Sequence, residues 1–378
     1  MKQHLSVVHA GSILLGDPYT GLSLEKCKER YRRFSDVLDT FFTYLREEEI
    51  DLVLFSGNLC GRYLTSEDAK QLITRLSDVP DCTFVISPGE KDPFDSDSLY
   101  ASGRLPSNAH IFENEALDCF TFPALGVRVY GWAIHGQRSN FAPLAGAVLG
   151  DRSMINLISG CCEITHRNLF AHVTHEDIAE SGADYAAFSH RAPSPIARVG
   201  NTLYCHAGFL EGRSFEEAGE GGIVRVDIAR DGEGDGRRVE ARFVPLYHHR
   251  YQSLSLDVTG ATDMSEVLES VRGLVEANGL GSETSLRVFL EGELAPTVML
   301  RRTTDEARDL SLYSLQLIDH TRPTLGADYL EKDMTVRGEL YRTLKKRIAS
   351  QNPQESYAVS QAFRAGLAAL ESRDITGI

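Results

Sequence analysis

The stretch Asp51-Leu52-Val53-Leu54-Phe55-Ser56-Gly57-Asn58-Leu59-Cys60-Gly61-Arg62 decides the fold of this chain. It opens with an apolar run of strand length, and this run ends abruptly in Ser-Gly-Asn. A run of this kind predicts a strand that is buried in a parallel sheet. Because α/β proteins bind ligands beyond the carboxyl ends of such strands, Asn58 and its neighbours mark a candidate site.

Strands and helices are expected to alternate through the first half of the chain. Apolar residues recur at helical spacing in the segment 24–48, which predicts a long helix with its polar segment 30–33 turned toward solvent. A second helix is expected at about 66–76, and Thr174 to Asp177 has the pattern of a helix cap. Strands are expected at 5–12, 51–55, 82–86, 127–132, 154–160 and 184–190, and the first of them runs into a loop at 13–21. Alternation with continuously apolar strands predicts a layered α/β core.

The pattern changes after Gly200. Segments 222–228 and 239–246 predict hairpin strands, and a strand, a helix and a strand at 253–258, 264–277 and 286–291 predict a small α+β unit. From about residue 328 the chain is expected to be helical, with Val336, Leu340, Leu344 and Ile348 every fourth residue. The expected domains are therefore residues 1–248, 249–322 and 323–378.

Composition narrows the class of protein. Among 378 residues, 39 basic and 54 acidic side chains give a net charge of −15, which argues weakly against a broad nucleic-acid surface. The seven cysteines form no Cys-x-x-Cys pair and are expected to be buried thiols, with Cys161 and Cys162 in the core. No apolar run approaches the roughly 20 residues of a membrane span, and no signal segment is recognisable. We expect a cytoplasmic protein that does not enter a membrane.

Six blocks of sequence, in order, resemble the calcineurin-like metallophosphoesterases and in particular their SbcD-like DNA repair exonuclease branch. The segment 8–16 resembles His-x-x-Asp-x-His-Leu-Gly, and the segment 51–62 resembles Asp-Leu-Val-Leu-x-x-Gly-Asp-Leu-x-Asp-Arg. The segments 85–93, 157–160 and 184–193 resemble the Gly-Asn-His-Asp, Leu-x-His-Gly and Gly-His-x-His blocks. The segment 208–220 resembles the end of the catalytic domain of that branch.

The resemblance implies a four-layer β-sandwich flanked by helices, followed by a small α+β capping domain and a helical C-terminal tail. It also implies a site with two divalent cations that polarise phosphate and activate water. At the corresponding positions this chain has Ser12, Leu14, Asn58, Glu90, Lys91, Ser159, His190 and Ala192. Only His190 keeps the family's residue, and Glu90 is a different possible ligand. We therefore expect no metal and no cofactor, and we assign no catalytic residue; Glu90, Lys91 and Asp92 are the degenerate positions.

Two hypotheses follow. In the first, the chain is an inactive relative of the exonucleases that acts by binding. The resemblance then implies a homodimer and an SMC-like ATPase that docks on the tail through Leu340, Leu344 and Ile348, with DNA disfavoured by the charge. In the alternative, a Mn²⁺-dependent phosphodiesterase or DNA exonuclease uses a rebuilt site of His9, Glu90, Asp92 and His190.

Other polar features favour ordinary structural roles. His166, His172 and His175 with Glu176 could suggest zinc, but their position at a helix cap favours surface histidines. A lone His190 at a strand end is more often hydrogen-bonded than metal-bound. The basic run from Arg342 to Arg347 is expected to be a solvated helix face.

Overall fold

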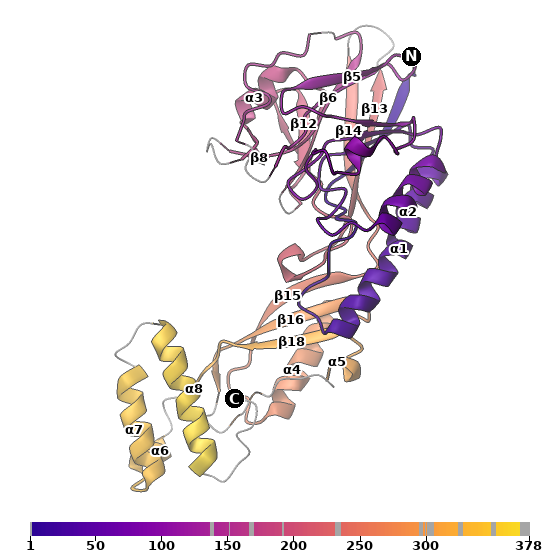
Figure 1. Ribbon diagram of the computed structural model, residues 1–378. Coiled ribbons are helices and arrows are strands. Elements are labelled where there is room, and N and C mark those ends of the chain that lie inside the picture. The colour runs from indigo at the N-terminus through magenta and orange to yellow at the C-terminus, as the bar shows by residue number, and fades with distance from the viewer. Residues whose placement is uncertain are drawn as a thin grey trace. The chain divides into compact units, whose positions relative to one another are not determined.

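The computed structural model describes residues 2–136, 140–150, 152–165, 170–190, 193–230, 236–294, 298, 300, 306–323, 328–348 and 353–370 (Figure 1). Along the chain the structure divides into two compact units, Met1–His248 and His249–Ile378.

The first unit is built on two six-stranded mixed sheets. Sheet 1 has the order β14-β13-β1-β2-β3-β4. Its strands are β1 (His4–Ala10), β2 (Leu52–Phe55), β3 (Thr83–Ile86), β4 (Ala109–Ile111), β13 (Gly222–Arg230) and β14 (Arg237–Pro245). The strands β1 to β4 run parallel, and β13 and β14 add an antiparallel hairpin next to β1.

Sheet 2 has the order β11-β12-β10-β7-β6-β5 and the same mixed character. Its strands are β5 (Asp118–Phe122), β6 (Val127–Gly131), β7 (Ile155–Cys161), β10 (Tyr185–Ser189), β11 (Ala197–Val199) and β12 (Thr202–His206). The central strands β6, β7, β10 and β12 are parallel, and β5 and β11 pair antiparallel at the two edges. The short strands β8 (Glu163–Ile164) and β9 (His172–Val173) form a separate pair.

Side chains of alternating residues divide the first unit into layers. Leu5, Val7, Leu52 and Leu54 of sheet 1 share one buried cluster with residues of sheet 2, so the two sheets pack face to face. The opposite face of sheet 1 packs against helices α1 (Leu24–Glu47) and α2 (Ser66–Ser77). The outer face of sheet 2 packs against α3 (His175–Ser181) and nearby loops. The result is a layered α/β unit that is consistent with a metallophosphoesterase-like fold.

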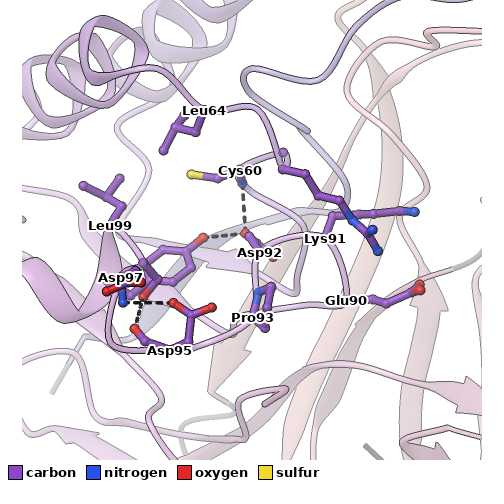
Figure 2. A pocket seen from close by; sticks show the side chains of 13 residues that line it. Cys60, Leu64, Glu90, Lys91, Asp92, Pro93, Asp95, Asp97 and Leu99 are labelled. Atoms are coloured by element: carbon purple, nitrogen blue, oxygen red, sulfur yellow. Dashed lines mark hydrogen bonds between the residues drawn. The ribbon is translucent and has the colours of Figure 1, made fainter. Parts of the chain in front are cut away.

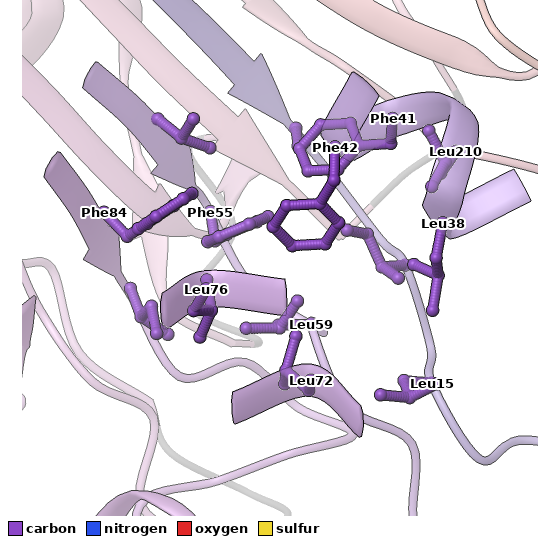
Figure 3. Packing of buried hydrophobic residues seen from close by; sticks show 14 of the residues in the cluster. Leu15, Leu38, Phe41, Phe42, Phe55, Leu59, Leu72, Leu76, Phe84 and Leu210 are labelled. Carbon is purple, nitrogen blue, oxygen red and sulfur yellow. The ribbon is translucent and has the colours of Figure 1, made fainter. Parts of the chain in front are cut away.

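Aromatic residues fill the layer between sheet 1 and its helices (Figure 3). The rings of Phe55 on β2 and Phe84 on β3 stack with centroids 6.0 Å apart. Phe41 and Phe42 of α1 reach these rings, at 6.1 Å from Phe55 and 6.3 Å from Phe84. Burial of four such side chains contributes several kcal/mol, at about 25 cal/mol per Å² of apolar surface. The long helix therefore anchors the strand that carries the candidate site.

The expectation that the segment 30–33 faces solvent is wrong for Arg30, which is buried. Its guanidinium pairs with the buried carboxylate of Glu211, which also accepts a hydrogen bond from the Tyr19 hydroxyl at 3.0 Å. A buried charge needs a partner, and sequence spacing cannot show one that comes from about 180 residues away. Arg33, on the other hand, is exposed.

The second unit contains a parallel three-stranded sheet with the order β15-β16-β18. Its strands are β15 (Arg250–Asp257), β16 (Thr284–Glu291) and β18 (Ser314–Asp319), and β17 (Glu293–Leu294) pairs with β19 (Arg322–Pro323). Val267, Val271 and Val275 of α4 (Met264–Ala277) are buried in one cluster with the sheet. A short helix, α5 (Glu306–Asp309), precedes β18. The role of this unit as a capping domain stays a prediction.

Three helices follow in the same unit, as expected from the sequence: α6 (Asp328–Lys332), α7 (Val336–Ile348) and α8 (Pro353–Leu370). Leu330, Tyr341 and Phe363 form their buried centre, and Leu340 and Leu344 pack against it. The exposed apolar residues of this region include Met334, 91% exposed, and Val336, 72% exposed. Among the described residues, no helix has the length and apolar character that a membrane crossing requires.

Candidate functional site

The candidate site lies where the carboxyl ends of the parallel strands of both sheets meet. Hydrogen bonds tie the two edges together: Ser189 Oγ donates to the carbonyl oxygen of Ser56 at 2.8 Å, and Ser87 Oγ contacts the carbonyl oxygen and Oγ of Ser159, each at 3.0 Å. All four serines are fully buried. Ser159, where the resemblance implies a histidine, is thus part of the seam between the sheets.

His9, at the end of β1, is buried within the same seam. Its Nε2 lies 3.1 Å from the carbonyl oxygen of Phe188, which can only accept, so Nε2 carries the proton. Its Nδ1 then accepts from the Tyr185 hydroxyl at 2.8 Å. Burial, and next the charge of His206, lower the pKa of His9 to about 3. The imidazole is therefore neutral at ordinary pH and holds strands together.

Asn58 is the centre of the loops that follow β1, β2 and β3. Its backbone adopts the left-handed conformation with φ of 56°. Its side-chain Oδ1 accepts from the backbone N–H of Lys91 at 2.9 Å, and its Nδ2 donates to Ser12 Oγ at 3.2 Å. Its carbonyl oxygen accepts from the N–H groups of Ile13 and Leu14. This amide thus joins the three loops that the resemblance assigns to metal binding.

Asp92 is a buried carboxylate that organises the same loops. Oδ1 accepts from the N–H groups of Asn58, at 3.0 Å, and Gly89, at 2.8 Å. Oδ2 accepts from the N–H of Cys60 at 2.9 Å and from the Tyr100 hydroxyl at 2.5 Å. Burial raises the pKa of Asp92 to about 6, against the effect of these four hydrogen bonds. Both carboxylate oxygens of Asp92 thus accept hydrogen bonds from the protein itself.

Leu14 is buried and also adopts a left-handed conformation, with φ of 56°. Its apolar side chain offers no lone pair at a position where the resemblance implies a histidine. Ser12 forms a bridge to Phe209, and its N–H donates to the carbonyl oxygen of Gly208 at 2.8 Å. Ala192, the remaining predicted site residue, lies outside the described residues.

His190 is held between two carboxylates. Its Nε2 lies 3.2 Å from Glu163 Oε1, and its Nδ1 lies 3.6 Å from Glu90 Oε2. Its ring stacks on Phe170, with the centroids 4.5 Å apart. Its φ of 112° is unusual for a residue with a side chain and marks local strain. Glu163 and Phe170 were missed at the sequence level, because neither lies in a block that resembles the family.

A pocket of about 360 Å³ lies beside these loops. It is lined by Cys60, Gly61, Arg62, Leu64, Glu90, Lys91, Asp92, Pro93, Asp95, Asp97, Ser98, Leu99 and Tyr100. Figure 2 shows the Asp92 side chain turned toward Cys60, whereas the side chains of Lys91 and Glu90 extend away from Asp92. The pocket therefore presents charges of both signs, with its cations on Arg62 and Lys91.

The segment after β12 contributes Arg213, which contacts the loop that follows β1. The Arg213 guanidinium donates to the carbonyl oxygens of Asp17, at 2.7 Å, and Ile13, at 3.0 Å. It also lies over the rings of Tyr19 and Phe34, at 4.8 and 4.4 Å from their centroids. The loop that carries Ser12 and Leu14 is therefore fixed by Arg213 as well as by Asn58.

The histidines near α3 do not gather into a site. His175 is exposed and its Nε2 lies 2.9 Å from the Tyr204 hydroxyl. His172 is half-buried, with Nδ1 2.9 Å from the carbonyl oxygen of Phe170, and His166 lies outside the described residues. Cys161 and Cys162 are fully buried, as expected.

Within the described ranges, no group of three or more His, Cys, Asp or Glu side chains is arranged to hold a metal ion. The donor chemistry agrees with this. Hard divalent cations prefer carboxylates and imidazoles, whereas Ser12, Asn58 and Ser159 are neutral and Leu14 is apolar. The two carboxylates at His190 face opposite nitrogens of its ring, which does not suit joint binding of one ion. These residues do not fit a dinuclear centre.

Three comparisons with known proteins bear on the family. No family model matches the chain. The uncharacterized metallophosphoesterase YhaO of Bacillus subtilis (strain 168) is 23% identical over 329 residues, which cover 81% of this chain and 77% of YhaO. The crystal structure of TT1561 of Thermus thermophilus aligns with 64% of this chain and 99% of its own, with 11% identity and a TM-score of 0.36. The chain is thus a distant homologue of a metallophosphoesterase.

Proposed function

We propose that this metallophosphoesterase relative, of the SbcD-like exonuclease type, has lost its dinuclear metal site and acts by binding another macromolecule. The observation that carries the proposal is the structural hydrogen bonding of Asn58. Both polar atoms of its amide, its N–H and its carbonyl oxygen are used in hydrogen bonds to the surrounding loops. Asn58, where the resemblance implies a metal-bridging aspartate, therefore has a structural role: it holds the surrounding loops together.

Electrostatics supports the same conclusion. A cluster of two divalent cations needs several anionic or imidazole ligands, and even changes in residues behind the ligands cost roughly 10- to 100-fold in metal affinity or activity. Here the chain has Lys91 where the resemblance implies a catalytic histidine, and an ammonium on this loop would repel a nearby cation. The buried carboxylate that these loops enclose, Asp92, already accepts four hydrogen bonds from the protein.

The proposed partner is a protein that docks on the helical tail, and the resemblance suggests an SMC-like ATPase. Leu340 and Leu344 contribute to the tail's own packing, so the exposed Met334 and Val336 are the better candidate contacts. DNA is the less favoured ligand because of the net charge of −15. A pull-down that compares the full chain with Met334→Ser/Val336→Ser tests the partner. Identical sets of captured proteins would reject the tail as the docking segment.

Metal content and hydrolysis test the loss of the site. After incubation with Mn²⁺ and desalting, elemental analysis is expected to find well below one metal ion per chain. Hydrolysis of bis-p-nitrophenyl phosphate is expected to stay at the level of a buffer control. Two bound ions per chain together with turnover would overturn the proposal.

A second candidate function, a Mn²⁺-dependent phosphodiesterase or exonuclease with a rebuilt site, is favoured by one observation. His190 lies between Glu90 and Glu163, an arrangement that suits proton transfer by the imidazole. Metal-dependent turnover that is lost in Glu90→Ala and His190→Ala but kept in His175→Ala would support it. His175 is a suitable control because it is exposed and bonded elsewhere.

A further inference from the structure

The strand β14 presents a long open edge. It has nine residues, and it is the terminal strand of sheet 1, paired on one side to β13. In the part of the chain that the structure describes, no backbone group bonds to its other side. The other edge strands of the first unit are shorter: β4 and β11 have three residues each and β5 has five. Because an open edge invites pairing with another strand, proteins usually keep such edges short.

Two positions near the middle of β14 lie opposite residues of like charge on β13. Arg242 lies directly opposite Arg225 of β13, and Glu240 lies directly opposite Asp227. Like charges in opposite positions destabilise a sheet. Arg225 is compensated by Glu48 at 2.7 Å and by Asp227 at 3.1 Å. Arg242 is exposed and forms no ion pair with any described residue.

We propose that β14 pairs antiparallel with β14 of a second copy of this chain, about a two-fold axis at Ala241. In this register Arg242 of each copy lies opposite Glu240 of the other. Arg242 thereby gains a carboxylate partner, in both copies at once, and Glu240 gains a second cation beside Arg238 of its own strand. On the other face, Val239 lies opposite Phe243, which is 37% exposed. Side chains alternate between faces along a strand, so both sets of pairs form together.

The axis at Ala241 is favoured over its neighbours by overlap and charge. Ala241 is the middle residue of Arg237–Pro245, so all nine residues take part. An axis at Glu240 would place Glu240 opposite itself and Arg238 opposite Arg242, and an axis at Arg242 would place Arg242 opposite itself. An axis at Val239 would join only the segment 237–241. The axis must pass through a residue and not between two residues. Directly opposite residues of paired strands point to the same face of the sheet, whereas neighbouring residues along one strand point to opposite faces.

This pairing joins the two copies of sheet 1 into one continuous sheet. It rests on the edge strand alone and does not depend on the proposed loss of the metal site. Ala241 favours close approach because its side chain is small, and it packs against the cluster between the two sheets.

Sedimentation velocity of the full chain over a range of concentrations tests the pairing. The wild-type chain is expected to dimerise, and Arg242→Glu is expected to weaken dimerisation by roughly tenfold or more, because two attractive pairs become repulsive. The same change removes the Arg225–Arg242 repulsion within each copy, so the unfolding midpoint is expected not to fall. A wild-type chain that stays monomeric at all concentrations would overturn the proposal.

The charge-swapped variant Glu240→Arg/Arg242→Glu supplies the matched control. It restores opposite charges across the two-fold axis and is expected to recover dimerisation. If Arg242→Glu leaves the dimerisation affinity unchanged, or if the charge swap fails to restore it, the interface lies elsewhere.

A cysteine at the axis gives a readout of register. Under mild oxidation, Ala241→Cys is expected to form an intermolecular disulfide, because directly opposite residues have Cβ atoms about 4.5–5.5 Å apart. Arg238→Cys, which lies opposite Val244 in this register, is expected to cross-link poorly. Equal cross-linking of both variants would contradict the register.

Discussion

The backbone N–H of Asn58 donates to Oδ1 of Asp92 over 3.0 Å, and this bond joins the loop after β2 to the loop after β3. The Asp92 carboxylate collects three further donors from Gly89, Cys60 and Tyr100. The loops that follow the central strands are thus organised around a buried carboxylate. In this chain a protein side chain provides the negative centre of the loops.

Removal of this centre is expected to be costly. Asp92→Ala leaves several buried donors without an acceptor and is expected to lower the free energy of unfolding by about 2–4 kcal/mol. Asp97→Ala, at an exposed position of the same pocket, is expected to change it by less than about 0.5 kcal/mol. Urea denaturation of both variants measures the difference. Similar values for the two would show that the network contributes little.

Gly57 has no room for a side chain. Its φ is 138°, and a Cβ atom would lie 2.6 Å from Ser189 Oγ and 2.7 Å from Cys161 Cβ. Gly57→Ala is therefore expected to lower the unfolding free energy by roughly 2–4 kcal/mol through strain and overpacking. Gly150→Ala, where a Cβ would contact nothing within 4 Å, is the control and is expected to be nearly neutral. Thermal unfolding compares the two, and equal midpoints would contradict this packing.

Two arginines of α1 are expected to differ sharply. Arg30→Ala leaves the buried Glu211 carboxylate without its cation and is expected to destabilise the protein by about 3–5 kcal/mol. Arg33→Ala removes only an exposed pair with Glu29, worth about 0.3–0.5 kcal/mol. Chemical denaturation of both variants gives the comparison. A cost for Arg30→Ala as small as that for Arg33→Ala would mean that Glu211 is satisfied by its other donors.

His9 is expected to make the protein sensitive to acid. Its folded-state pKa of about 3 lies below the unfolded value of 6.5, so the unfolded chain binds more protons between these values. The stability that this group contributes is therefore present above about pH 6.5 and is lost as the pH falls toward 3, by on the order of 5 kcal/mol in total.

The variant His9→Gln isolates this effect, because it removes the titrating ring. Relative to His9→Gln, the wild-type free energy of unfolding is expected to fall steadily from pH 6.5 to pH 4. Asp92 acts in the opposite direction, since its pKa is raised to about 6, and it is common to both proteins. A difference between wild type and variant that does not change with pH would contradict the buried neutral imidazole.

Much of the secondary structure could be predicted from local pattern. The helix at 264–277 was predicted with its observed bounds, and the strands at 51–55, 82–86 and 184–190 were predicted to within a residue or two. The cap at Thr174 is confirmed by a reciprocal capping box with Asp177. These features depend on periodicity and on bonds between residues close in the chain. The strand β5, which is half exposed and carries no strong apolar pattern, was missed.

The site was only partly predictable. The sequence placed Asn58, Lys91 and Asp92 at strand ends, but it could not show that Asn58 bonds to Lys91 or that Asp92 accepts four hydrogen bonds. Glu163 and Phe170 beside His190 come from segments without a recognisable motif. Side-chain partners that are tens of residues apart depend on how the sheets pack, which single-sequence patterns do not encode.

What the sequence determined by itself is the order of elements and the residue types at the strand ends, because apolar period and strand length are local properties. Only the tertiary structure decided what those residues do. It buried Arg30 against Glu211, made His9 a neutral link between sheets and turned Asn58 into the junction of three loops. The reason is physical: a buried polar group must find a partner, and the partner is fixed by the packing of distant segments.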